Sequence, residues 1–145
     1  MVSAKNNMQT YYQKNISHIN EILTEAATTI SDWRMSDDDV NDTMLIIEEI
    51  AANIVYHGFQ KNDITISSRE IKFKIKKMED QIKIIFCDRS PRFNPILHES
   101  AQIKNYLQLN MIGGLGIHFV KALTKKIQYR YINNHNFLVL TKSLQ

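Results

Sequence analysis

Cysteine, proline and glycine are scarce in this chain of 145 residues, which has one Cys, two Pro and four Gly. The single cysteine, Cys87, cannot form an internal disulfide, and it lacks the Cys and His neighbours that a zinc site needs. We therefore expect Cys87 to be a core thiol in a protein of a reducing compartment.

Long hydrophobic runs are also missing. Apolar stretches such as Met44 to Ile47 are broken by charge, and none approaches the roughly 18 residues of a membrane span. The first residues, MVSAKNNMQTYY, contain no apolar segment of the secretory type. We expect a cytoplasmic protein that makes no membrane contact.

Charge of one sign is not in large excess, since 18 Lys and Arg face 15 Asp and Glu for a formal charge of +3. No helix-turn-helix or zinc pattern is present, and aromatics do not alternate with Arg and Lys, so direct nucleic-acid binding is disfavoured. The pattern Gly-x-x-x-x-Gly-Lys-Ser/Thr is absent, which excludes the P-loop way of binding phosphate.

The remaining composition is that of an ordinary globular protein, with 43% hydrophobic and 23% charged residues. A chain of this length fits one compact domain, so we predict a single domain over residues 1–145.

Two helices are predicted in the first part of the chain. From about Met8 to Ile30, apolar residues recur at steps of three and four. Ser36 has the character of an N-cap for the second helix, because three aspartates follow it where the helix dipole favours acid. Gly58 is expected to end this helix in a left-handed conformation.

Strand patterns follow the helices. Alternating apolar residues predict strands over 71–76 and 82–86, with Glu79 and Asp80 in the turn between them. Residues 89–111 show no period and predict a long loop, after which a short helix opens at a glycine cluster. A final hairpin turns at Asn133 and Asn134. This order predicts an α+β fold, a two-layer sandwich with helices on one face of a mixed, mostly antiparallel sheet.

Glu49 and Asn53 are the first candidate site residues. A four-residue step leaves their side chains about 40° apart on one helix face, whereas Glu48 points about 140° away from Asn53. The spacing therefore selects Glu49 from the Glu48–Glu49 pair, although such a pair also occurs on ordinary solvated helix faces.

Two further segments are candidates for a ligand-binding site. Asp88 directly follows a buried strand, where a carboxylate can face a pocket or simply cap a turn. Gly113-Gly114-Leu115-Gly116 opens a helix, where free N–H groups and the helix dipole favour phosphate. Glycine-rich turns before helices are common, so this segment alone carries little weight.

In their order along the chain, these segments resemble the signature of the histidine-kinase, gyrase and chaperone (GHKL) ATPase superfamily, which has a Bergerat-type ATP-binding fold. Residues 49–53 match its N box, 88–95 its first glycine box and 113–117 its second. The flanking sequences Asn53-Ile-Val-Tyr-His57-Gly58 and Arg92-Phe93-Asn94-Pro95 are similar to those of the small bacterial anti-sigma factor serine kinases. The resemblance spans most of the chain.

The resemblance implies a role for each matched position. Asp88 would accept a hydrogen bond from the adenine amino group of ATP, Asn53 would coordinate Mg²⁺, and Glu49 would orient or deprotonate the attacking hydroxyl. Residues 91–112 would form a lid. Further nucleotide contacts would come from Ser90, Arg92, Gly113, Gly114, Leu115 and Gly116, with Lys104 as another candidate; Arg92 and Lys104 are otherwise surface cations.

Ser90 departs from the family pattern, which usually has glycine two residues after the adenine-binding aspartate. If the backbone there is left-handed, serine is strained by about 1 kcal/mol, and its Cβ is expected to crowd the adenine. Arg92 also stands where many relatives have proline.

The implied function is that of an ATP-dependent protein-serine kinase and anti-sigma factor. Its partners would be a sigma factor and a small STAS-type antagonist, with a homodimer as one option. The alternative is an ATP-sensing interaction module that transfers no phosphoryl group, and a third hypothesis is a nucleic-acid binder with salt-sensitive affinity.

Overall fold

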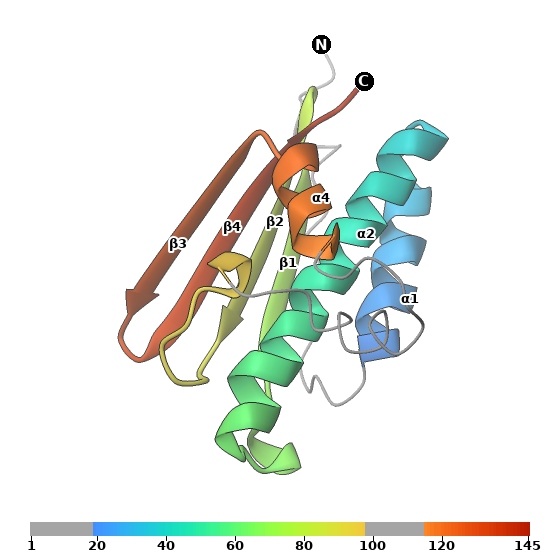
Figure 1. The fold of residues 1–145 in the computed structure, drawn as a ribbon. Coiled ribbons are helices and arrows are strands. Elements are labelled where there is room, and N and C mark those ends of the chain that lie inside the picture. The colour runs from blue at the N-terminus through green and yellow to red at the C-terminus, as the bar shows by residue number, and fades with distance from the viewer. Residues whose placement is uncertain (1–18, 98–114) are drawn as a thin grey trace.

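The structure is a computed structural model that describes residues 19–97 and 115–145. Within these residues, helices cover one face of a four-stranded sheet (Figure 1). The helices are α1 (Ile19–Ser31), α2 (Asp37–Asn53) and α4 (Leu115–Leu123), and short 3₁₀ turns lie at Ile66–Ser68 and Pro95–Leu97. The predicted α+β two-layer sandwich is therefore confirmed.

The strands are β1 (Ile71–Lys77), β2 (Gln81–Asp88), β3 (Lys126–Ile132) and β4 (His135–Ser143). They lie in the order β1-β2-β4-β3, and every pairing is antiparallel. Asn133 and Asn134 have positive φ of 52° and 61°, which confirms the predicted hairpin turn between β3 and β4. In the register of β2 with β4, Asp88 faces Asn136.

The start of α2 follows the predicted capping. Ser36 accepts a hydrogen bond on its hydroxyl oxygen from the Asp39 N–H at 3.1 Å. The other predicted helix is described only from Ile19 onward, because residues 8–18 lie outside the described residues.

The prediction that Gly58 ends this helix is wrong. The chain continues from α2 into a π-helix, Ile54–Phe59, and a 3₁₀ turn, Gln60–Asn62, and the left-handed residue is Asp63 with φ 53°. Gly58 is needed for space instead. A Cβ at this position would lie 2.7 Å from Cε1 of Phe93 and 2.9 Å from Oγ of Ser90.

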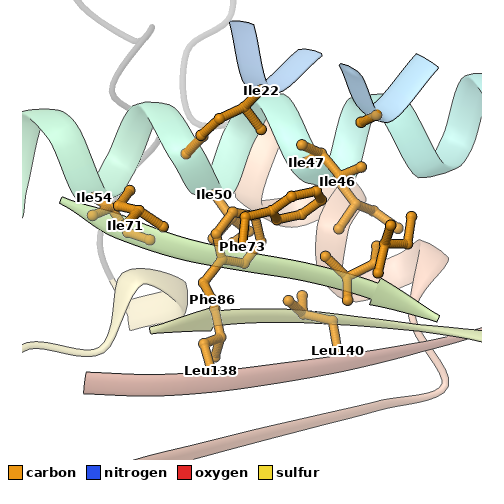
Figure 2. Close-up of a cluster of buried hydrophobic side chains, with 14 of the residues drawn as sticks. Ile22, Ile46, Ile47, Ile50, Ile54, Ile71, Phe73, Phe86, Leu138 and Leu140 are labelled. Carbon is orange, nitrogen blue, oxygen red and sulfur yellow. The ribbon is translucent and has the colours of Figure 1, made fainter. Parts of the chain in front are cut away.

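The core lies between the helices and the sheet (Figure 2). Phe73 and Phe86 meet there with their ring centroids 5.2 Å apart. Around them pack buried aliphatic side chains from α1, α2, β1 and β4: Ile22, Ile46, Ile47, Ile50, Ile71, Leu138 and Leu140. This layer fixes α2 above the carboxyl end of β2, which is where the candidate site lies.

Cys87 is buried, as predicted, but on the other face of the sheet. It alternates with Phe86, so its side chain points away from the helices and lines a hollow of ≈ 460 Å³ together with Ile85 and Phe137. Burial raises the pKa of the thiol, which is the condition of an unreactive cysteine.

No helix among the described residues is long and apolar enough to span a bilayer.

Candidate functional site

Glu49 lies at the contact between α2 and α4, which pack side by side on one face of the sheet (Figure 1). Its side chain is buried, whereas Glu48 is exposed, as the helical spacing predicts. Gly116, in the first turn of α4, leaves room for the carboxylate: a Cβ there would lie 2.0 Å from Oε2 of Glu49. The glycine therefore lets an acid sit against a helix start, where the dipole favours negative charge.

Asn53 is completely buried one turn further along α2. Its Nδ2 donates a hydrogen bond to the Pro95 carbonyl at 3.1 Å. Pro95 belongs to the segment that follows β2, so this bond ties α2 to the loop carrying the first glycine-box sequence. The amide group also carries an oxygen, the kind of ligand that Mg²⁺ prefers.

Asp88 is the last residue of β2, and it is 3% exposed. Its Oδ1 accepts hydrogen bonds from the Ser90 N–H at 2.8 Å, from Asn136 Nδ2 at 3.1 Å and from the Ser90 hydroxyl. Burial raises the pKa of Asp88, and the hydrogen bonds from Ser90 and Asn136, with nearby His135, lower it only in part. The result is a buried acceptor with one oxygen fully engaged.

The predicted strain at Ser90 is absent. Among the described residues, the non-glycine residues with positive φ are Arg34, Asp63, Asn133 and Asn134, so Ser90 is not left-handed. Ser90 is buried, and both its N–H and its hydroxyl donate hydrogen bonds to Asp88 Oδ1. Ser90 therefore gives the Asp88 carboxylate two donors, its backbone N–H and its hydroxyl.

Asn136 is the site residue that the sequence reasoning missed. It is buried at an inward position of β4, and its Oδ1 accepts from Tyr129 Oη at 2.6 Å and from the Phe93 N–H at 3.0 Å. Its Nδ2 reaches the Ser90 carbonyl at 3.0 Å as well as Asp88. The available signal was an amide at the inward phase of a strand whose next inward residues are leucines.

Of the other predicted site residues, some are described by the structure and some are not. Arg92 is exposed, and its guanidinium lies 5.6 Å from the centre of the Tyr131 ring. Leu115 is the first residue of α4. Gly113, Gly114 and Lys104 lie outside the described residues, as does most of the predicted lid, residues 91–112.

The described part of the site is nevertheless continuous. Asn53 contacts the loop after β2, Glu49 contacts the first turn of α4, and Phe93 of the same loop connects to β4 through Asn136. The described residues of the three sequence segments thus lie on one face of the sheet, and they include two buried acids, Glu49 and Asp88, and the buried amide of Asn53, with Asn136 of β4 beside them.

Comparison with known proteins agrees with this arrangement. Residues 12–142 match the family described as histidine kinase-like ATPase domain. A chain in the crystal structure of the SiaB–SiaC complex from Pseudomonas aeruginosa matches this fold with a TM-score of 0.65 and 12% sequence identity, covering 97% of this chain and 91% of that chain. At this identity the likeness shows the fold alone. No curated protein matches the sequence.

Proposed function

Because this chain belongs to the histidine kinase-like ATPase domain family, which makes it an ATP-binding domain, we propose that it is a regulatory protein-serine kinase. Its substrate would be a serine of a small STAS-type antagonist, and it would also sequester a sigma factor. The observation that carries the proposal is the buried Glu49 carboxylate, held against the first turn of α4 and one helical turn from Asn53.

Asp88 is the proposed acceptor for the adenine amino group. Only an ionised carboxylate offers an acceptor with no competing proton, and its buried position removes competition from water. The glycines before and within α4, Gly113, Gly114 and Gly116, would let the helix N–H groups approach the phosphates. Leu115, Ser90 and Arg92 complete the proposed nucleotide contacts.

Mg²⁺ fits the residues present. Among the described residues, no group of three or more His, Cys, Asp or Glu side chains is placed to hold a metal. An ion in this site would take its remaining ligands from ATP phosphates and water, which is the coordination that Mg²⁺ favours. Asn53 would hold it through the amide oxygen, since its Nδ2 is bonded to Pro95. When bound, the ion neutralises phosphate charge.

Glu49 would act on the attacking hydroxyl. The serine oxygen forms a bond to the γ-phosphorus, the bond from this phosphorus to the β–γ bridging oxygen breaks, and ADP leaves. The hydroxyl proton passes to the Glu49 carboxylate. Such a base contributes roughly 10²- to 10⁴-fold to the rate.

The test is transfer of labelled phosphate from Mg²⁺–ATP to a purified STAS-type antagonist. Glu49→Gln should lower transfer by at least about 100-fold, because the amide cannot accept the proton, while ATP affinity stays within about twofold. Glu48→Gln is the matched control, since this neighbouring acid is exposed, and it should behave as wild type.

Partner regulation supplies a second readout of the same variants. The similar chain of known structure comes from a SiaB–SiaC complex, which supports a role exercised on a bound protein. If wild type binds ATP but transfers nothing, and Glu49→Gln regulates a partner as wild type does, the ATP-sensing interaction module replaces the kinase.

A further inference from the structure

We propose that the sheet face opposite the helices binds an acidic amphipathic helix of a partner protein. This open face consists of the even-numbered side chains of β1 (72–76) and β3 (126–132) and the odd-numbered side chains of β2 (81–87) and β4 (135–143). It lies across the sheet from the candidate nucleotide site, so the inference goes beyond the proposed function and does not depend on it.

The strand register places cations at the edges of the open face and apolar residues in its middle. One row across the sheet consists, from β1 to β3, of Lys72, Cys87, Phe137 and Arg130. The next row consists of Lys74, Ile85, Val139 and Gln128. The two central strands therefore present an apolar strip, and the edge strands place positive charge on both sides of it.

No described helix packs on this apolar strip, because α1, α2 and α4 all lie on the other face of the sheet (Figure 1). Ile132 is 45% exposed, and Phe137 is only half-buried. These two side chains line both of two adjoining hollows, of ≈ 460 Å³ and ≈ 370 Å³, which therefore form one groove. A contiguous exposed apolar surface with a polar rim is typical of an interaction site.

The charge of the open face has one sign. Its outward strand positions hold six cations and no acid: Lys72, Lys74, Lys76, Lys83, Lys126 and Arg130. The whole chain has a formal charge of only +3, so this face concentrates positive charge. Glu70 lines an adjoining hollow at the β1 edge, beside Lys72. A field of this kind favours a partner with negative charge.

The charge argues against covering by this chain itself. In a twofold dimer through the open face, the cations of one copy would meet those of the other. Residues 1–18 contain two lysines and no acid, so they do not complement the face either. A nucleic-acid duplex would match the rim but offer no apolar group to the strip, and a flat bilayer surface does not fill a groove. A partner protein segment supplies both acid and apolar side chains.

The dimensions of the open face fit a helix. Neighbouring strands lie about 4.8 Å apart, so the cations of β1 and β3 are roughly 14 Å apart across the strip. A helix with its side chains is about 10–12 Å wide and fits between them. From His135 to Thr141 the strip is about 20 Å long, the length of a helix of roughly 13 residues. Apolar side chains of this helix would enter the groove, and its flanking acids would face Lys72, Lys74 and Arg130.

The probe for this surface is a fluorescein-labelled synthetic peptide of about 14 residues, with Leu at steps of three and four and Glu on both flanks. Fluorescence anisotropy measures its binding to the full chain without nucleotide. The peptide should bind at least about tenfold more tightly than two matched peptides, one with Lys for each Glu and one with Ser for each Leu. Its affinity should fall severalfold as salt is raised from about 50 to 500 mM, because exposed charges are screened.

Variants of the chain locate the binding. Lys72→Glu combined with Arg130→Glu reverses one exposed cation on each side of the strip and should weaken peptide binding by at least about tenfold. Ile132→Ser removes an exposed apolar side chain from the groove and should also weaken binding. Lys61→Glu combined with Lys121→Glu makes the same charge change at exposed lysines outside the strands and should leave affinity within about twofold of wild type. Thermal melts check that every variant is folded.

Several results would overturn the proposal. They include equal binding of the three peptides, no binding of any, and an equal loss in the two charge-reversed pairs. A wild-type dimer in sedimentation that Ile132→Ser dissociates would make the open face an interface between copies. Binding of phosphatidylserine vesicles or a DNA duplex, lost in Lys72→Glu with Arg130→Glu, would assign it to a membrane or nucleic acid if the acidic peptide does not bind. Failure of the chain to bind ATP would contradict the proposed function alone.

Discussion

At the scale of one residue, burial of the Asp88 carboxylate lowers the stability of the folded protein when the group is ionised. Because burial raises its pKa, the folded protein holds the Asp88 proton more tightly than the unfolded chain does. Between the unfolded and the raised folded pKa, stability therefore falls as the pH rises. At neutral pH the ionised Asp88 carboxylate therefore destabilises the fold, a cost that agrees with the binding role proposed for it.

Replacing this carboxylate tests both effects. Asp88→Asn keeps an oxygen for the donors of Ser90 and Asn136 but has no charge, so it should melt at a higher temperature than wild type at neutral pH. The gap in melting temperature should close as the pH falls below the raised pKa of Asp88. ATP should bind at least about tenfold more weakly, because an amide NH₂ would face the adenine amino group.

Two measurements check this prediction, thermal melts across pH and calorimetric ATP titrations. A variant that melts below wild type at neutral pH contradicts the stability argument. Unchanged ATP affinity would contradict the assignment of Asp88 as the adenine acceptor.

At the scale of elements, the site depends on close approach between the helix that continues α2 and the loop after β2. Gly58 lies in the π-helix, Ile54–Phe59, directly under Phe93 and Ser90. Phe93 in turn donates its backbone N–H to Asn136. A side chain at position 58 would therefore push on the same loop that positions the Asp88 donors.

Gly58→Ala should destabilise the protein by about 1–3 kcal/mol through overpacking. Helix propensity alone predicts the opposite sign, a gain of about 1 kcal/mol for alanine. Chemical denaturation distinguishes the two. Adding Phe93→Leu to Gly58→Ala should restore part of the loss, and a single variant more stable than wild type would rule out the clash.

Local pattern predicted most of these elements and part of the site. The alternation of apolar and polar residues predicted the strands, and the Ser36 N-cap predicted the start of α2. The four-residue helical step from Asn53 predicted that Glu49, which is buried, belongs to the site, rather than Glu48, which is exposed. The function of Gly58 and the contacts of Asn136 were not predictable in this way. Both depend on residues more than 30 positions away, brought close by sheet register and loop packing, and neither has a local period.

At the scale of the whole molecule, β4 joins the site to a buried ion pair at the other end of the sheet. Near its end, Lys142 Nζ lies 3.0 Å from Oδ1 of Asp39, in the first turn of α2. The Gln145 N–H donates to the other Asp39 oxygen at 2.9 Å. Burial of Asp39 opposes its ionisation, but these partners outweigh it and lower the pKa.

Lys142→Met should reduce the free energy of unfolding by about 3–5 kcal/mol, because Asp39 would keep a buried charge without its cation. Since a lowered pKa contributes stability that is lost as pH falls through it, the difference from wild type should shrink in acid. Urea unfolding at several pH values measures this. Lys125→Met, at an exposed lysine, is the control, and an equal loss there would refute the ion-pair argument.

The pairing of Asp88 with Asn136 in the strand register has a consequence for assembly. If β4 were to pair with β2 one residue out of register, Asn136 would point to the opposite face of the sheet. Asp88 would then lose the hydrogen bond from Asn136 Nδ2. Only the observed alignment of β2 and β4 brings Asn136 against Asp88. Binding of a nucleotide at the proposed site would therefore favour chains whose strands have this register.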